Sequence, residues 1–261
     1  MPLDPATFTA LRCRDCRNGA GLDFAFSMAF QPIVDVRRRR IHAYEALVRG
    51  PANEGAATIL GRVHDGNRYR FDQACRVKAI EVAARLGLPE REGCLLHINF
   101  LPNAVYRPET CIRATLEAAA EFRFPTERIV FEVTEGEKVR DEAHLQGIVT
   151  EYRRHGFATA IDDFGAGYSG LNLLANFQPD IIKLDMALTR NLDMDRARRA
   201  IVAGVLMTCR ELGIVVIAEG VETAGELRAL EDLGVELVQG YLLGKPAFEQ
   251  LLPIQTDWEK T

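Results

Sequence analysis

Short apolar runs alternate with longer amphipathic segments along most of the chain, from Phe26 onward. The runs are rich in Leu and β-branched residues and lack clean apolar–polar alternation, which is typical of strands buried on both faces. Eight runs are predicted to be strands: Met28–Val34, Ile41–Val48, Cys94–Asn99, Ile129–Thr134, Phe157–Asp162, Asp180–Asp185, Ile214–Glu219 and Glu236–Gln239.

Two of the longer segments, Phe71–Leu86 and Arg196–Leu212, place apolar residues about one helical turn apart. These residues are Ala74, Val77, Ile80 and Ala84 in the first segment and Ile201, Val205, Cys209 and Leu212 in the second. Strands and helices in alternation favour a mostly parallel sheet. Eight strands in 261 residues are typical of an eight-stranded α/β barrel. A doubly wound open sheet is the alternative, because strand count does not decide closure.

The first two strands are expected to form an antiparallel hairpin. Only Asp35 to Arg40 separate them, which is too short for a parallel crossover. The four arginines Arg37–Arg40 would then occupy the tip, where a solvated turn is favoured over a nucleic-acid contact. The predicted fold is therefore a TIM-like (β/α)8 barrel with an antiparallel first strand.

The N-terminal 23 residues are polar and irregular, so we expect residues 1–23 to be an extension or linker and residues 24–261 to be the barrel. Cys13 and Cys16 form a CxxC pair there, but no second pair follows at zinc-finger spacing, which favours a plain surface segment. Six cysteines are too few for a disulfide scaffold and fit a reducing cytoplasm.

The overall charge and hydropathy narrow the possible partners. The net charge is −5 and the pI near 5.7, which does not suit a protein that binds long nucleic acids through a polybasic surface. No signal-peptide core begins the chain, and no apolar run approaches the roughly 18 residues that span a membrane. We therefore expect a cytoplasmic protein with no membrane segment in this chain.

Polar residues recur where the predicted strands end, which is the position that carries the chemistry of α/β barrels. They are Glu45, Asn99, Glu132, Asp162 with Asp163, Lys183 with Asp185, Glu219 and Gln239. Carboxylates gathered at one rim repel each other, so they require cations. Ligands that are all oxygen atoms select magnesium or manganese over zinc or copper.

The acidic rim is typical of a metal-dependent phosphoesterase. Adjacent Asp162 and Asp163 can flank two metals, a standard device for phosphodiester hydrolysis. Lys183 adds a cation to hold the nucleophile or the developing charge, and Glu219 is a candidate metal ligand or general base. His97 lies on the same strand face as Asn99 but one layer deeper, and we expect it in the core or behind the ligands. A Schiff-base aldolase on Lys183 is disfavoured, because acidic neighbours would keep the amine protonated.

A series of motifs in this order resembles the EAL-domain cyclic-di-GMP phosphodiesterases, over about Phe26 to Pro246. The motifs are Gln31-Pro32-Ile33-Val34, Glu45-Ala46-Leu47 with Arg49, Ile98-Asn99, Phe131-Glu132-Val133-Thr134-Glu135, Asp162-Asp163-Phe164-Gly165, Lys183-Leu184-Asp185, Ala218-Glu219-Gly220-Val221-Glu222 and Gln239-Gly240-Tyr241. The resemblance implies a barrel with one antiparallel strand. It also implies hydrolysis of cyclic di-GMP to linear pGpG with two divalent ions, Mg²⁺ or Mn²⁺, in a homodimer that is often fused to or regulated by a sensory domain.

The resemblance also implies a role for each matching residue. The first metal would be held by Glu45, Asn99, Glu132 and Asp162, and the second by Asp162, Asp163 and Glu219. Lys183 would position the attacking water, Glu219 would be the general base, and Glu45 belongs to the catalytic set. Substrate contacts would come from Gln31, Leu47, Arg49, Asp185 and Gln239, with Arg49 on a phosphate and Asp185 alternatively orienting Lys183. Glu135 would anchor the loop after Asp163 and couple metal binding to dimerisation.

The chain departs from the common family pattern at a few places. Gly50-Pro51 follows Arg49 in a shortened form, and Ala166 and Gly170 replace the hydroxyl residues usual in the loop after Asp163. These changes are expected to affect the rate of hydrolysis and its regulation, and not the metal ligands. Because no metal ligand is missing, we expect an active phosphodiesterase. The alternative is a receptor module that binds cyclic di-GMP with weak or no catalysis.

Overall fold

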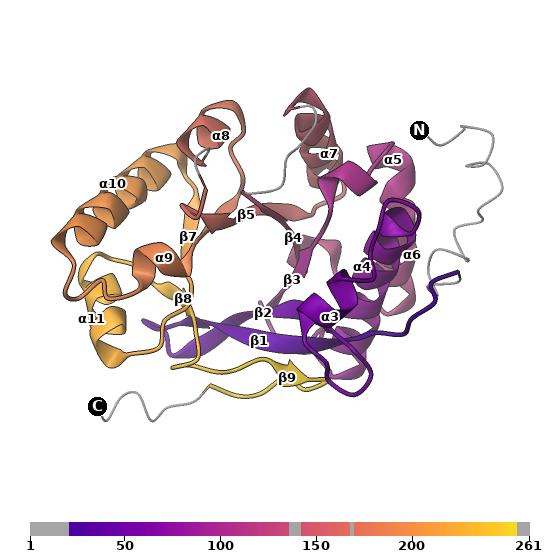
Figure 1. The fold of residues 1–261 in the computed structure, drawn as a ribbon, viewed down its shortest axis with the longest axis horizontal. Coiled ribbons are helices and arrows are strands. Elements are labelled where there is room, and N and C mark those ends of the chain that lie inside the picture. Colours follow the sequence, from indigo (N-terminus) through magenta and orange to yellow (C-terminus); the bar gives the residue numbers. More distant parts are fainter. Residues whose placement is uncertain (1–20, 136–141, 168–169, 255–261) are drawn as a thin grey trace.

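The computed structural model describes residues 21–135, 142–167 and 170–254. Eight strands close into a ring with helices around it (Figure 1). The ring strands are β1 (Ser27–Asp35), β2 (Arg40–Arg49), β3 (Leu95–Asn99), β4 (Ile129–Thr134), β5 (Ala158–Phe164), β6 (Ile181–Leu184), β7 (Val215–Ala218) and β8 (Leu237–Gln239). Because β1 pairs with both β2 and β8, the barrel prediction is confirmed and the open sheet is wrong.

The first strand is the one that runs against its neighbours. β1 is antiparallel to β2 and to β8, whereas the pairs from β2 to β8 are parallel. The predicted hairpin is confirmed, with Asp35 opposite Arg40 at its end. At its exposed tip, Arg37 binds Glu236 at 2.6 Å and Arg38 binds Asp35 at 2.9 Å. The arginine run therefore forms a solvated turn held by acidic partners.

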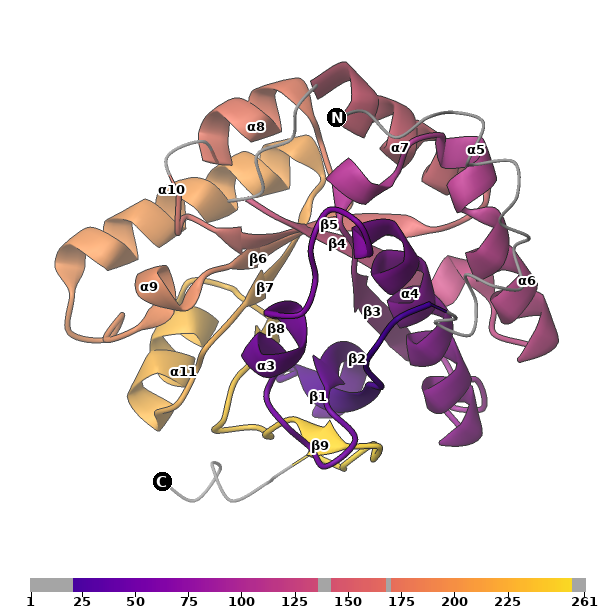
Figure 2. The ribbon, with the colours of Figure 1, turned by 45° about the vertical axis from the view of Figure 1, so that its right-hand side comes forward.

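The helices lie outside the ring, as two views show (Figure 2). They are α3 (Ala56–Leu60), α4 (Arg68–Arg85), α5 (Pro108–Cys111), α6 (Arg113–Glu121), α7 (Glu142–Arg154), α8 (Gly170–Asn176), α9 (Met186–Thr189), α10 (Arg196–Leu212) and α11 (Ala224–Asp232). Short 3-10 turns cover Pro102–Ala104 and Thr126–Arg128. Both helices predicted from apolar spacing are confirmed, as α4 and α10.

The buried face of α10 differs from the prediction. Val202, Val205 and Cys209 are its buried residues. Ile201 and Leu212 are 52% and 45% exposed, because the buried face of the helix is centred on Val202 and Val205 and these two residues lie at its edge. The apolar spacing identified the helix correctly and assigned two of its residues to the wrong face.

The inside of the ring is layered, because alternate residues of each strand point inward. An apolar floor is formed by Ile33, Ala43, Val130, Ala160, Ile181, Ile217 and Leu237. Two residues further along the same strands, toward the carboxyl ends of the parallel strands, the inward side chains are polar. Outside the ring, one apolar cluster packs β2–β4 against α4, α6 and α7, and another packs β5–β8 against α8, α10 and α11. The floor and these clusters support the polar layer from below and from outside.

The chain after β8 returns to the outside of the barrel. A two-residue strand, β9 (Ala247–Phe248), pairs with Ala29 and Phe30 of β1 (Figure 1). Further along, the Tyr44 hydroxyl donates to the carbonyl of Leu252 at 2.6 Å. This strap covers the hairpin edge that would otherwise stay open.

The predicted boundary at residue 23 stays a prediction. Cys13 and Cys16 lie outside the described residues. Phe24 and Phe26 already pack on Phe71 of α4, with ring centroids 6.0 Å and 5.4 Å away. Among the described helices, none combines the length and apolar character that crossing a bilayer requires.

Candidate active site

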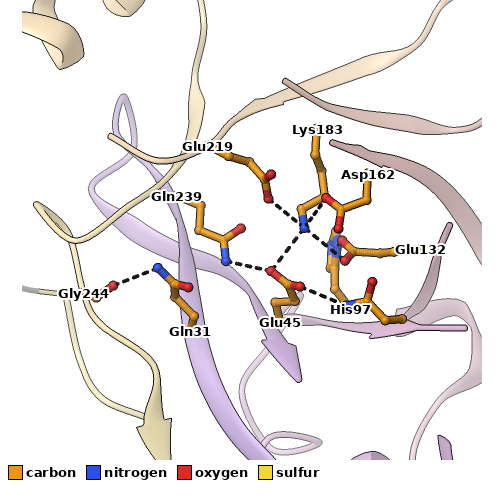
Figure 3. Close-up of polar contacts among 10 residues, drawn as sticks. Gln31, Glu45, His97, Glu132, Asp162, Lys183, Glu219, Gln239 and Gly244 are labelled. Atoms are coloured by element: carbon orange, nitrogen blue, oxygen red, sulfur yellow. Dashed lines mark hydrogen bonds and ion pairs between the residues drawn. The ribbon is translucent and has the colours of Figure 1, made fainter. Parts of the chain in front are cut away.

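A buried lysine lies at the centre of the polar layer. Lys183 projects from β6, and its Nζ contacts four carboxylates from four other places in the ring (Figure 3). The distances are 3.1 Å to Glu45 Oε2, 3.0 Å to Glu132 Oε2, 2.9 Å to Asp162 Oδ1 and 2.7 Å to Glu219 Oε1. The arrangement follows from the barrel, because each of these residues lies in the carboxyl-terminal half of a strand or directly after it, toward the same rim.

The charges of this cluster do not balance. Burial opposes the ammonium, but the four carboxylates outweigh it and raise the pKa of Lys183 well above its usual value. Burial raises the pKa of Glu132 and of Glu219, against the effect of Lys183. For Glu45, Lys183 and its hydrogen bonds overcome burial and lower the pKa. One cation shared among four acids leaves negative charge that further cations would neutralise.

Two amide side chains orient Glu45. Asn99 Nδ2 donates to Glu45 Oε1 at 3.0 Å, and Gln239 Nε2 donates to Glu45 Oε2 at 2.8 Å. The other amide atom of Gln239, Oε1, is buried and has no hydrogen-bond partner among the described residues. Gln31 lies beside this group and donates to the carbonyl of Gly244 at 3.2 Å. Gln239 thus keeps an acceptor free for a ligand.

A histidine supports the cluster from below. His97 Nδ1 lies 2.6 Å from Glu132 Oε1, and both side chains are fully buried. Burial and the charge of Lys183 lower the pKa of His97 well below its ordinary value, so the ring is neutral.

The acidic residues fall into two groups that could each hold a metal ion. Glu45, Glu132 and Asp162 form one group, and Asp162, Asp163 and Glu219 form the other, with ligand atoms within 4.8 Å of one another in each. Both groups offer oxygen donors alone, and they share Asp162. This donor set fits magnesium or manganese. The groups contain the carboxylates that the sequence assigned to a first and a second metal.

The end of β5 and the turn after it contain backbone conformations that few residues adopt. Asp163 has φ 54° and Gly165 has φ 96°. This φ of Gly165 is one that L side chains rarely adopt, and a Cβ there would also lie 2.4 Å from Leu188 Cδ1, so the position favours glycine. Glu135 Oε2 accepts the N–H of Gly165 at 2.7 Å and so anchors the loop. Burial and the charge of Asp162 raise the pKa of Asp163 to about 6.

Two cavities flank the carboxylates. One, of about 300 Å³, is lined by Gln31, Glu45, Leu47, Asp162, Asp163, Asp185, Met186, Glu219, Gly220, Glu222, Gln239, Gly240 and Tyr241. The other, of about 310 Å³, shares Glu45, Leu47 and Asp162 and continues over apolar side chains of β2, β3, α3 and α4. A larger hollow of about 810 Å³ lies against α4 and α6, and its lining contains no residue of the acidic cluster. The two smaller cavities are therefore the candidate substrate site.

The remaining predicted contacts occupy different positions around these cavities. Asp185 lines the first cavity, and its Oδ1 accepts the N–H of Ala187 as the cap of α9. Arg49 ends β2, where its guanidinium donates to the carbonyl of Val48 at 2.8 Å. Arg49 is absent from the described lining of both cavities.

Several lining residues were missed from the sequence. Glu222 and Tyr241 lie in the EAL-like motifs, and Met186 directly follows Asp185; all three line the first cavity, although the sequence pattern predicts no role for them. Glu222 pairs with Arg190 at 2.9 Å, and Tyr241 is 52% exposed. Glu222 and Tyr241 lie three and two residues after the strand-end residues Glu219 and Gln239, and this spacing could have indicated them. Loop residues have no apolar periodicity, so the hydrophobic pattern does not predict where their side chains point.

Comparison with known proteins agrees with this geometry. The profile described as the EAL domain matches residues 20–246. The chain belongs to the EAL domain family. A c-di-GMP-bound structure of a standalone EAL protein from Vibrio cholerae is 53% identical, with a TM-score of 0.87, over 92% of this chain and 100% of that one. A manganese and cyclic di-GMP complex of Klebsiella pneumoniae BlrP1 is 35% identical, with a TM-score of 0.82, over 88% and 58%.

The curated EAL relatives are longer than this chain. The Escherichia coli blue light- and temperature-regulated antirepressor BluF is 34% identical over 83% of this chain and 53% of its own length. A cyclic di-GMP phosphodiesterase of Pseudomonas aeruginosa is 26% identical over 98% of this chain and 44% of its own length. The chain thus spans about half the length of these relatives.

Proposed function

We propose that this EAL domain hydrolyses cyclic di-GMP to linear pGpG with the help of two divalent metal ions. The observation that carries the proposal is the complete cluster of four carboxylates around Lys183, with its two groups of metal-binding oxygens. The cyclic di-GMP complexes of the related Vibrio and Klebsiella proteins support the substrate.

The carboxylates would hold the metals. Glu45, Glu132 and Asp162, with Asn99 beside them, would bind one ion, and Asp162, Asp163 and Glu219 the other. When bound by these residues, Mg²⁺ or Mn²⁺ would supply the activation of a water molecule and the neutralisation of charge on the phosphate. A calcium complex of Klebsiella BlrP1 also exists, so binding alone does not identify the productive metal.

Two side chains would act on protons and charge. Lys183 stays protonated and so would orient the attacking water and offset charge on the phosphate. Glu219, whose pKa burial raises, would accept the proton of that water, because a base works best when its pKa approaches the working pH. The protonated state of Lys183 also argues against an aldolase, which requires a free amine.

The substrate would span both cavities. Their volumes of about 300 and 310 Å³ on either side of Glu45 and Asp162 suit a ligand with two bases flanking a phosphate ring. Gln31, Leu47, Asp185 and Gln239 line the first cavity and would contact the nucleotide, and Arg49 would need to turn inward to reach a phosphate. A homodimer coupled through Glu135, a sensory partner and a cytoplasmic location remain predictions.

A receptor that binds without cutting is the second candidate. The Escherichia coli relative BluF, 34% identical, favours it, because its name describes an antirepressor and names no hydrolytic activity. The intact carboxylate cluster favours the enzyme, since a receptor has no need of two metal groups.

One assay separates the two functions. The protein is incubated with cyclic di-GMP and Mn²⁺, with or without EDTA, and the products are separated by chromatography, with the Asp162→Asn variant as matched control. We expect pGpG from the wild-type protein alone, and only without EDTA. Tight binding of cyclic di-GMP with no pGpG would establish the receptor and refute the enzyme.

A further inference from the structure

His97 occupies an unusual place for a polar side chain. It points into the barrel two residues before Asn99 and pairs in register with Val130, a residue of the apolar floor. Its side chain is fully buried. Burying a polar ring in such a place is costly unless the ring is hydrogen-bonded.

The hydrogen bonds of His97 are limited to one partner. Nδ1 lies 2.6 Å from Glu132 Oε1, whereas Nε2 has no partner among the described residues. A carboxylate that binds a metal ion is deprotonated and only accepts, so in the metal-binding state Nδ1 carries the hydrogen and donates it to Glu132. Among the described residues, the one side-chain hydrogen bond of His97 is therefore made to an oxygen of a residue in the acidic cluster.

The two oxygens of Glu132 consequently have different tasks. Oε1 is held by His97 from below, and Oε2 lies 3.0 Å from Lys183 Nζ, in the cluster (Figure 3). The ring also prevents the carboxylate from rotating, because the bond is short and both groups are enclosed. Glu132 thus presents one oxygen to the cation site.

We propose that His97 is a positioning residue that restricts Glu132 to a single coordinating oxygen and so favours Mg²⁺ or Mn²⁺ over Ca²⁺ at this site. The inference rests on the proposed function, since it requires the acidic cluster to be a metal site. Mg²⁺ takes six ligands in a compact octahedron, while Ca²⁺ accepts six to eight and often binds both oxygens of one carboxylate. Freeing Oε1 would therefore improve the site for calcium and loosen it for the smaller ions.

The test compares three substitutions in the metal-free full chain. His97→Leu removes the donor, His97→Asn keeps a donor where Nδ1 stood, and Ile217→Ala weakens the floor without touching Glu132. Titration calorimetry with Mn²⁺ alone and Ca²⁺ alone, in the absence of nucleotide, gives both dissociation constants. Removal of such a supporting partner typically weakens metal binding about 10–100-fold.

The outcomes distinguish this role from a structural one. We expect His97→Leu to weaken Mn²⁺ about 10-fold or more and to lower the preference for Mn²⁺ over Ca²⁺, His97→Asn to restore most of both, and Ile217→Ala to change neither. If His97→Leu does not fold, His97→Met, whose flexible side chain fits irregular spaces, takes its place. Unchanged Mn²⁺ affinity in the donor-less variant would overturn the inference while leaving the phosphodiesterase standing. A wild-type protein that binds no Mn²⁺ would overturn both.

Discussion

Replacing Lys183 by methionine removes the ammonium that four carboxylates share and keeps an unbranched side chain one atom shorter. At an effective dielectric constant of about 20, two unit charges 3 Å apart interact by about 5.5 kcal/mol. The carboxylates recover part of this loss by taking up protons, and breaking a buried ion pair typically costs about 3–5 kcal/mol. We therefore expect metal-free Lys183→Met to lose about 3–5 kcal/mol of unfolding free energy at pH 8.

The loss should depend on pH in a definite direction. Without Lys183, burial and mutual repulsion raise the folded-state pKa of the carboxylates above their unfolded values. Groups of this kind contribute stability below the unfolded pKa, near 4.5, and that stability is lost as pH rises through the folded pKa. The difference between wild type and Lys183→Met should thus be smaller at pH 5 than at pH 8.

Urea unfolding followed by circular dichroism, in EDTA at pH 5 and pH 8, measures both effects. Lys78→Met is the matched control, because Lys78 pairs with Glu81 at 2.7 Å near the surface and its loss should cost about 1 kcal/mol or less. Adding Mn²⁺ should stabilise Lys183→Met, since metal at 100 times its dissociation constant contributes about 2.7 kcal/mol. Equal stability of Lys183→Met and wild type at pH 8 in EDTA would refute the role of Lys183 as internal counter-ion.

Three further substitutions probe the rest of the site. Glu45→Gln should lower turnover at least about 100-fold, and calorimetry should detect one fewer bound Mn²⁺ ion. Near-native turnover would show that Glu45 is not a metal ligand. Because the folded-state pKa of Asp163 is raised to about 6, its charge destabilises the metal-free protein above that pH. Asp163→Asn should therefore raise the melting temperature in EDTA more at pH 8 than at pH 4.5, and an equal shift would contradict this. Glu135→Gln should cost about 1–2 kcal/mol and speed amide exchange at Gly165, whose N–H would lose a charged acceptor; unchanged exchange would show that the loop has another anchor.

The barrel and its acidic rim were predictable because both depend on local pattern. Most of the apolar runs carry a polar residue at or near their carboxyl end, which the structure brings to the rim, and the six residues from Asp35 to Arg40 exclude a crossover. Once the strands are parallel, their carboxyl ends must converge. The sequence alone therefore places Glu45, Lys183 and Glu219 in one layer.

Features set by tertiary contacts could not be predicted in this way. The strap β9 is two residues long and exists through pairing with Ala29 and Phe30, about 220 residues earlier in the chain. β5 extends two residues past its predicted end, to Phe164. Asp163 therefore lies inside the strand, and it has a positive φ there. The bond from His97 to Glu132 joins neighbouring strands whose registers no apolar pattern specifies.

The double pairing of β1 has a consequence for the order of synthesis and folding. β2 follows β1 directly in the chain, but the other neighbours of β1, β8 and β9, follow about 200 residues later. At about 5–20 residues per second, a ribosome needs about 10–40 s to supply them. During this interval one side of the hairpin is an unsatisfied edge, open to pairing with other chains. Barrel closure therefore depends on segments that are synthesised last, and slow synthesis prolongs the period in which this edge is exposed.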